Sequence, residues 1–149
     1  MAEPDMKKIE EEARVISKEI NGLPEKNAPN LNRVRKHVSR RIKTWSGEEV
    51  VHLGLLLLEM HGQRGMANEL IFYHPEAVAA LNVQWVERLG RGIDSWFTTD
   101  SFGVNISGPA WMLDRLADAD VARWAASDNR WWRRTALVST VPLNTISRG

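Results

Sequence analysis

The sequence predicts an all-α protein, specifically an α-solenoid in which antiparallel helix pairs stack on one another. Apolar residues recur at spacings of three and four along nearly the whole chain, which is the period of an amphipathic helix. Gly, Pro and helix-capping residues separate these segments at short intervals, and no sustained alternation of β-branched residues predicts a strand. The pattern gives about nine helices joined by short turns, as stacked helix pairs require. A compact irregular bundle is the alternative, because no repeat of fixed period is visible.

Two amphipathic helices are predicted in the first 45 residues. The first covers about residues 5–21 and ends at Asn21-Gly22 and Pro24; its apolar positions are Met6, Ile9, Ala13, Ile16 and Ile20. The second covers about residues 31–45, with apolar positions at Leu31, Val34, Val38, Ile42 and Trp45.

Three more helices are predicted between residues 46 and 89. Ser46 and Glu49 have the spacing of a capping box and open a helix over about 48–61, which residues 53–58 make apolar nearly all round. That helix is therefore expected to be buried between neighbours. A fourth helix over about 64–73 is followed by His74-Pro75, where Pro75 suits the first turn of a fifth helix extending to Leu89.

The remaining segments are shorter. Asp94 or Ser95 is expected to cap a sixth helix that ends at Phe102, and residues 107–109 are expected to start a seventh. An eighth follows Asp118 or Asp120, and residues 127–129 offer caps for a ninth over about 130–141.

Composition excludes several classes of protein. The 149 residues suit a single helical-repeat domain, and a net charge of +1 means that only the distribution of charge could attract an anionic partner. There is no cysteine, the first 15 residues lack a signal-peptide core, and residues 55–58 are too short an apolar run to span a membrane. These features predict a cytoplasmic protein with no membrane partner.

The end of the chain raises one further expectation. An apolar helix is followed directly by residues 141–144 and a short tail, whereas a solenoid needs a terminal pair with a polar outer face. We therefore expect that C-terminal helix pairs are lacking, or that the uncovered edge mediates self-association.

The predicted second helix is strongly basic. It contains no acidic residue and six cations: Arg33, Arg35, Lys36, Arg40, Arg41 and Lys43. Such a helix could bind phosphates, with Arg35, Lys36 and Arg40 as the predicted contacts. Alternatively, these charges pair with the acidic residues 10–12 of the first helix.

Trp96 and Asp100 stand four residues apart, so a helix places them on one face. An indole beside a carboxylate is a plausible site for a cationic or sugar-like group. The alternative places Trp96 in the core and Asp100 at the surface or in a helix cap.

Residues 129–134, Asn-Arg-Trp-Trp-Arg-Arg, place two indoles and three guanidiniums at the start of the predicted ninth helix. Cations oppose the helix macrodipole there, and phosphate binding by Arg130, Arg133 and Arg134 would explain them. In the alternative, one Trp packs inward and Arg133 or Arg134 pairs with a nearby acid, Asp100, Asp114 or Asp128.

No metal site or cofactor is predicted. The four histidines are scattered without pairing on one helix, and no glycine-rich nucleotide-binding motif is present.

Three segments together resemble the AlkD-like DNA alkylation repair enzymes, which are DNA glycosylases built from HEAT-like helix pairs. The match extends over about residues 30–144, and its specific part is residues 95–102 (SWFTTDSF), 108–111 (GPAW) and 124–138 (WAASDNRWWRRTALV). Phe97 stands where many members have an acidic or small residue, and Thr99 where Val is common.

The resemblance implies a solenoid that holds duplex DNA and excises purines alkylated at N3 or N7. By position, Trp96 and Asp100 match the family's Trp and catalytic Asp, and Arg134 matches an Arg that contacts DNA near the lesion, with Arg133 as the fallback. Trp131 and Arg130 are expected to add to the DNA-contacting face. The alternative function is a non-catalytic HEAT-like module that binds DNA or protein.

Overall fold

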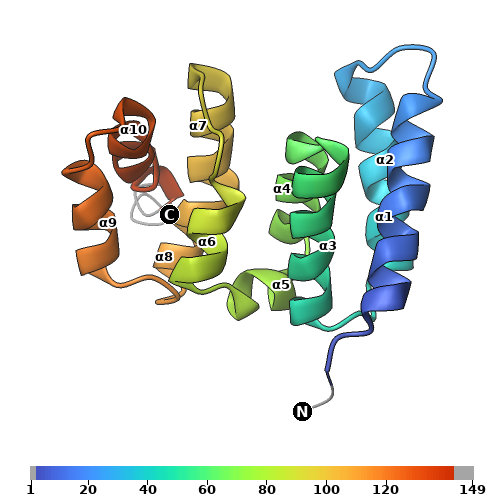
Figure 1. The fold of residues 1–149 in the computed structure, drawn as a ribbon, viewed down its shortest axis with the longest axis horizontal. Coiled ribbons are helices and arrows are strands. Elements are labelled where there is room, and N and C mark those ends of the chain that lie inside the picture. The colour runs from blue at the N-terminus through green and yellow to red at the C-terminus, as the bar shows by residue number, and fades with distance from the viewer. Residues whose placement is uncertain (1–2, 143–149) are drawn as a thin grey trace. The chain divides into compact units, whose positions relative to one another are not determined.

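The computed structural model describes residues 3–142, and within them the prediction of an all-helical fold made of antiparallel helix pairs is confirmed (Figure 1). The chain divides into two compact units, residues 1–77 and residues 78–149. None of the described helices is long and apolar enough to cross a membrane.

Unit 1 (residues 1–77) consists of two helix pairs and the start of a fifth helix. Its elements are α1 (Met6–Asn21), α2 (Ala28–Arg41), α3 (Gly47–His61), α4 (Arg64–Phe72) and α5 (Pro75–Ala80), which continues into the second unit. The pair α1–α2 stacks on the pair α3–α4, so that α1 packs on α3 and α2 on α4. Successive pairs of an α-solenoid pack in this way.

The apolar helix α3 forms the middle of unit 1, as its sequence predicts. Leu53, Leu55 and Leu57 are buried against α1 and α4. The predicted capping box is also confirmed: the Ser46 hydroxyl accepts a hydrogen bond from the Glu49 amide, and the Glu49 carboxylate accepts one from the Ser46 amide. Glu49 further binds the ammonium of Lys8, at 2.8 Å, and thereby ties α1 to the start of α3.

This ion pair gives a testable pH dependence. The hydrogen bond from Lys8 is the main factor that lowers the pKa of Glu49 below its ordinary value of 4.5. A carboxylate with a lowered pKa stabilises the fold above the ordinary pKa, and the contribution is lost as the pH falls through the lowered one. We expect Glu49→Gln to reduce the unfolding free energy by about 1 kcal/mol at neutral pH and by nothing in acid, measured by urea denaturation. Glu48→Gln is the control, and an equal loss at both pH values would contradict this account.

Unit 2 (residues 78–149) contains shorter helices than predicted. They are α6 (Val83–Leu89), α7 (Trp96–Phe102), the π-helical segment η1 (Gly103–Ser107), α8 (Gly108–Met112), α9 (Asp118–Ala125) and α10 (Arg130–Val138). Helix α10 packs on α9, α7 and η1. Trp132 of α10 is the centre of this packing, because its ring lies against Trp124 and Phe102 and above Gly90.

Several predicted helix boundaries are wrong. The second helix covers Ala28–Arg41 rather than residues 31–45, so Trp45 lies beyond its end. The predicted helix from Pro75 to Leu89 is interrupted at Leu81 and Asn82, where the Asn82 side chain accepts a hydrogen bond from the Trp85 amide and so starts α6. The predicted break between Phe102 and Trp111 is absent, since α7, η1 and α8 follow one another without a gap. In η1 the Gly108 amide donates to the Gly103 carbonyl, a wider turn that lets the helix continue into Pro109.

The predicted apolar edge at the end of the chain lies partly outside the described residues. Within them, α10 ends at Val138 rather than near residue 141, and Leu137 and Val141 are 63% and 45% exposed. Self-association through this edge remains a prediction.

Candidate functional site

The candidate site lies where α7 meets the first turns of α10 in unit 2. Helix α7 begins at Ser95, whose hydroxyl accepts from the Thr98 amide while the Thr98 hydroxyl accepts from the Ser95 amide. Helix α10 begins at Asn129, whose side chain accepts from the amides of Trp131 and Trp132. Both ends are therefore fixed by caps, so the side chains in the first two turns of each helix have defined positions.

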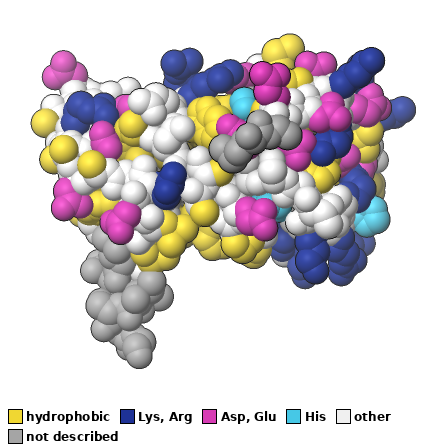
Figure 2. Space-filling model, turned by 90° about the horizontal axis from the view of Figure 1, so that it is seen from below, with side chains coloured by type: hydrophobic (Ala, Val, Ile, Leu, Met, Phe, Trp, Pro, Cys, Tyr) yellow, Lys and Arg dark blue, Asp and Glu magenta, His cyan; other side chains and the backbone are white. Residues whose placement is uncertain are grey.

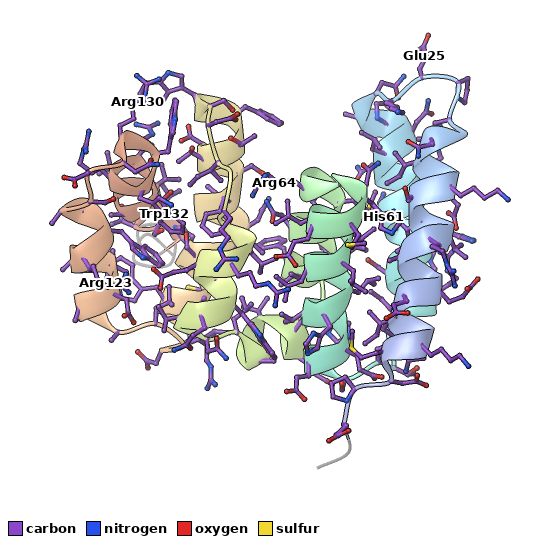
Figure 3. The ribbon with its side chains drawn as sticks, in the orientation of Figure 1. Glu25, His61, Arg64, Arg123, Arg130 and Trp132 are labelled. Carbon is purple, nitrogen blue, oxygen red and sulfur yellow. The ribbon has the colours of Figure 1, made fainter. Side chains whose placement is uncertain are left out.

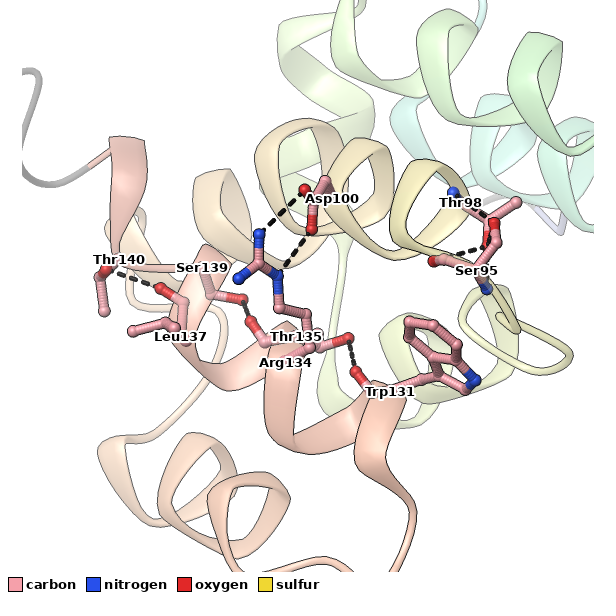
Figure 4. Close-up of polar contacts among 9 residues, drawn as sticks. All are labelled: Ser95, Thr98, Asp100, Trp131, Arg134, Thr135, Leu137, Ser139 and Thr140. Carbon is pink, nitrogen blue, oxygen red and sulfur yellow. Dashed lines mark hydrogen bonds and ion pairs between the residues drawn. The ribbon is translucent and has the colours of Figure 1, made fainter.

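Asp100 and Arg134 join the two helices through a two-point ion pair (Figure 4). The Arg134 Nε lies 3.0 Å from one carboxylate oxygen of Asp100, and its Nη2 lies 3.1 Å from the other. The hydrogen bond that Arg134 donates to Asp100 is the main factor that raises the pKa of Arg134 above its ordinary value. The Asp100 side chain remains 42% exposed, so the carboxylate is both positioned and accessible.

Two tryptophans complete the cluster. The Arg134 guanidinium carbon lies 4.7 Å from the centre of the Trp96 ring, and the Trp96 ring meets the Trp131 ring edge-to-face at 5.7 Å. The guanidinium carbon of Arg130 lies 4.3 Å from the centre of the Trp131 ring. Two cations and two indoles thus follow one another along the surface beside Asp100, an arrangement suited to a phosphate chain with sugars and bases.

Figure 3 shows Arg130 at the outer end of α10 and Trp132 within unit 2, so the adjacent indoles have different roles. Of the two interpretations of residues 129–134, the inward-packing Trp is found in Trp132, and the pairing of an arginine with an acid is found in Arg134 and Asp100. The alternative in which Trp96 is a core residue is wrong, because its side chain is 63% exposed.

The structure does not bring every predicted residue into this cluster. Arg133 instead donates to the backbone carbonyl of Ser127, at 2.7 Å. Arg35, Lys36 and Arg40 lie on α2, in unit 1. Pairing with α1 is found for Arg41, which binds Glu12 and Glu19. Lys36 and Arg40 are exposed, and phosphate binding by this helix remains a prediction.

Sequence reasoning missed one residue of the site. Phe97 follows Trp96 and is 83% exposed, and it lines a shallow pocket of about 500 Å³ together with Trp96, Asp100 and Val104. Large apolar side chains are seldom exposed to solvent to this extent. In the sequence, the signal for Phe97 was that it stands where many members of the resembled family have an acidic or small residue.

Among the described residues, no three side chains of metal-binding type are placed to hold a metal ion. The pocket beside Asp100 is lined by apolar, hydroxyl and amide groups around the Asp100 carboxylate.

Comparison with known proteins identifies the family of the chain. A family model described as DNA alkylation repair enzyme matches residues 12–147. Searches of curated proteins and of solved structures give no significant match. Because the family model covers most of the sequence, including α7 and α10, the chain belongs to the DNA alkylation repair enzyme family.

Proposed function

We propose that this protein is a DNA glycosylase that excises purines alkylated at N3 or N7 from duplex DNA, with Asp100 as the catalytic carboxylate. The observation that carries the proposal is the accessible Asp100 carboxylate, held by Arg134 beside the exposed ring of Trp96. Membership of a DNA alkylation repair family supplies the substrate class.

The proposed reaction needs few catalytic groups. An N3- or N7-alkylated purine already carries a positive charge, so it leaves without protonation by a general acid. The remaining requirement is to stabilise the cationic, oxocarbenium-like sugar and to orient a water molecule. A single carboxylate does both, with the indole of Trp96 packed on the sugar and Arg134 on an adjacent phosphate.

The ion pair with Arg134 has a defined part in this scheme. In the free protein it fixes the Asp100 carboxylate with both oxygens occupied by N–H donors. When DNA binds, a phosphate competes for the same guanidinium and leaves more of the carboxylate's charge to the sugar. Arg134 therefore positions the catalytic group before binding and contacts DNA afterwards.

Lesion specificity tests this mechanism. We expect the full chain to release 7-methylguanine from a duplex that carries it at one site, and to leave uracil or hypoxanthine at the same site intact. Only the first base leaves as a neutral molecule without being protonated. Release of all three at similar rates would contradict the proposal, because uracil and hypoxanthine need either a general acid or groups that stabilise an anionic leaving base.

Arg134→Ala is expected to weaken binding to duplex DNA about 10-fold and to reduce the slope of log affinity against log salt by about 1. The reason is the loss of one phosphate contact. Fluorescence anisotropy at several salt concentrations measures both quantities. Arg123→Ala is the control, because Arg123 is an exposed arginine of the same unit that pairs with Glu87. Equal effects of the two substitutions would show that Arg134 contributes only general charge.

Phe97→Ala is expected to lower the affinity for lesion-containing duplex about 10-fold without reducing the unfolding free energy, because Phe97 is 83% exposed and stacks only on DNA. The same anisotropy titration, together with urea denaturation, tests this. Leu113→Ala removes another exposed apolar side chain of unit 2 and serves as the control. Unchanged affinity in Phe97→Ala would remove Phe97 from the site.

A non-catalytic DNA-binding module is the second candidate. The observation in its favour is that the Asp100 carboxylate, which lines the pocket, is already ion-paired, as a structural residue would be. This candidate predicts DNA binding with the same salt dependence and no release of any base.

A further inference from the structure

Unit 1 contains a second pocket, of about 500 Å³, that the proposed glycosylase chemistry does not use. It lies between α2 and the turn that connects α4 to α5. Helix α2 contributes Arg35, Ser39 and the exposed Lys36 and Arg40, the turn after α2 contributes the exposed Lys43, and the turn between α4 and α5 contributes Tyr73 and His74.

Arg35 is a buried cation without a counter-ion. The residue is only 8% exposed, and it forms no ion pair with any of the described residues. Its guanidinium lies flat on Tyr73, 3.7 Å from the ring centre, and Nη1 donates to the Ser39 hydroxyl at 3.4 Å. Its Nε is buried and has no hydrogen-bond partner in the described part of the chain. Because buried charges in proteins are normally paired, the environment of this guanidinium favours binding of an anion.

His74 adds a second unused donor to the same pocket. The residue is 7% exposed, and its Nδ1 accepts a hydrogen bond from the Ala77 amide at 3.1 Å. Because Nδ1 accepts this hydrogen bond, Nε2 carries a proton, and Nε2 is buried with no hydrogen-bond partner among residues 3–142. Two buried N–H donors that line one pocket are unusual, since nearly all such groups are satisfied.

The remaining charges of the pocket favour a multiply charged anion. Lys36, Arg40 and Lys43 are exposed, and none of them forms an ion pair within residues 3–142. Glu76 is the one carboxylate among the described lining residues, against four cations. Figure 2 shows Lys and Arg side chains gathered on the surface of unit 1. A phosphate group has more acceptor oxygens and more negative charge than a single carboxylate, so it matches these donors better.

We propose that Arg35 and His74, together with Lys36, Arg40 and Lys43, form a binding site for a phosphate group. The phosphate comes either from the DNA backbone or from a small phosphorylated molecule. The first source rests on the proposed function, whereas phosphate binding itself does not.

The test titrates the full chain with inorganic phosphate at constant ionic strength, with chloride as the replaced anion. Thermal unfolding and the ³¹P resonance report binding, because a ligand that binds only the folded state raises Tm by mass action. We expect a phosphate-specific rise in Tm for the protein. The affinity should fall at least about 10-fold in Arg35→Met and in His74→Asn, since each removes a buried donor. In His74→Asn the shorter amide side chain can still accept the hydrogen bond from the Ala77 amide, so we expect this variant to fold. Its affinity for phosphate therefore tests the proposal even if Arg35→Met does not fold.

Arg33→Met is the matched control, because Arg33 is an exposed cation of α2 outside this pocket, and it should bind phosphate as the parent does. No effect of phosphate beyond that of chloride, or parental affinity in a folded Arg35→Met or His74→Asn variant, would overturn the proposal. Competition by an unmodified duplex assigns the site to the DNA backbone, and its absence assigns it to a small phosphorylated ligand. Asp100→Asn should bind phosphate normally, which separates this site from the proposed glycosylase.

Discussion

Asp100→Asn is expected to slow the release of alkylated purines by about 100- to 1,000-fold while leaving DNA affinity within a few-fold of the parent. The amide keeps the size of the carboxylate but loses the charge that stabilises the cationic sugar, and removal of one such electrostatic group has effects of this order. Single-turnover release of 7-methylguanine measures the first quantity, and anisotropy measures the second.

The fold should tolerate this change. The Asp100 side chain is 42% exposed, and the guanidinium that it leaves unpaired is solvated. Removing any surface carboxylate raises DNA affinity slightly, because it reduces repulsion of the phosphates. Asp128→Asn controls for this effect, since Asp128 is exposed and lines a different pocket. If both variants released base at the parental rate, Asp100 would be a structural partner of Arg134 and no more.

Gly47→Ala is expected to reduce the unfolding free energy by about 3 kcal/mol or more, the largest effect on stability among the substitutions considered. A Cβ atom at Gly47 would lie 2.0 Å from the carbonyl oxygen of Glu76 and 2.5 Å from its carbonyl carbon. Both are backbone atoms at the start of α5, so the added methyl group can be accommodated only if α3 and α5 separate. Urea denaturation followed by circular dichroism measures the loss.

Gly65→Ala is the matched control for this substitution. Gly65 lies within α4, and nothing lies within 4 Å of the position that its Cβ would take. Alanine there should stabilise the protein by about 0.5–1 kcal/mol, as in other exposed helix interiors. Equal effects of the two substitutions would contradict the close approach of α3 and α5.

The helices were predictable from the sequence wherever a local signal decides the structure. The capping residues Ser46, Ser95 and Asn129 are found as N-caps, because their hydrogen bonds join atoms within three residues of one another. The errors occurred where a local signal was ambiguous. Asn82 interrupts a stretch with continuous helical period, and Pro109 follows a π-helical turn that no spacing of apolar residues reveals.

The site was predictable only in its local part. Trp96 and Asp100 share a face because they are four residues apart, but whether that face is buried depends on the packing of the whole unit. The Asp100–Arg134 pair spans 34 residues, and the sequence left three acids open as partners. The exposure of Phe97 likewise follows from tertiary packing, which periodicity does not report. The same holds for the buried donors of Arg35 and His74, which have no partner among residues 3–142.

The most direct measurement is the release of free bases from methylated duplex DNA by the full chain, with the products separated by chromatography. We expect 7-methylguanine and 3-methyladenine to appear and abasic sites to form in equal number. A folded protein that binds the duplex and releases neither base would contradict the proposed activity, and would identify the site of Asp100, Trp96 and Arg134 as a DNA-binding surface without glycosylase activity.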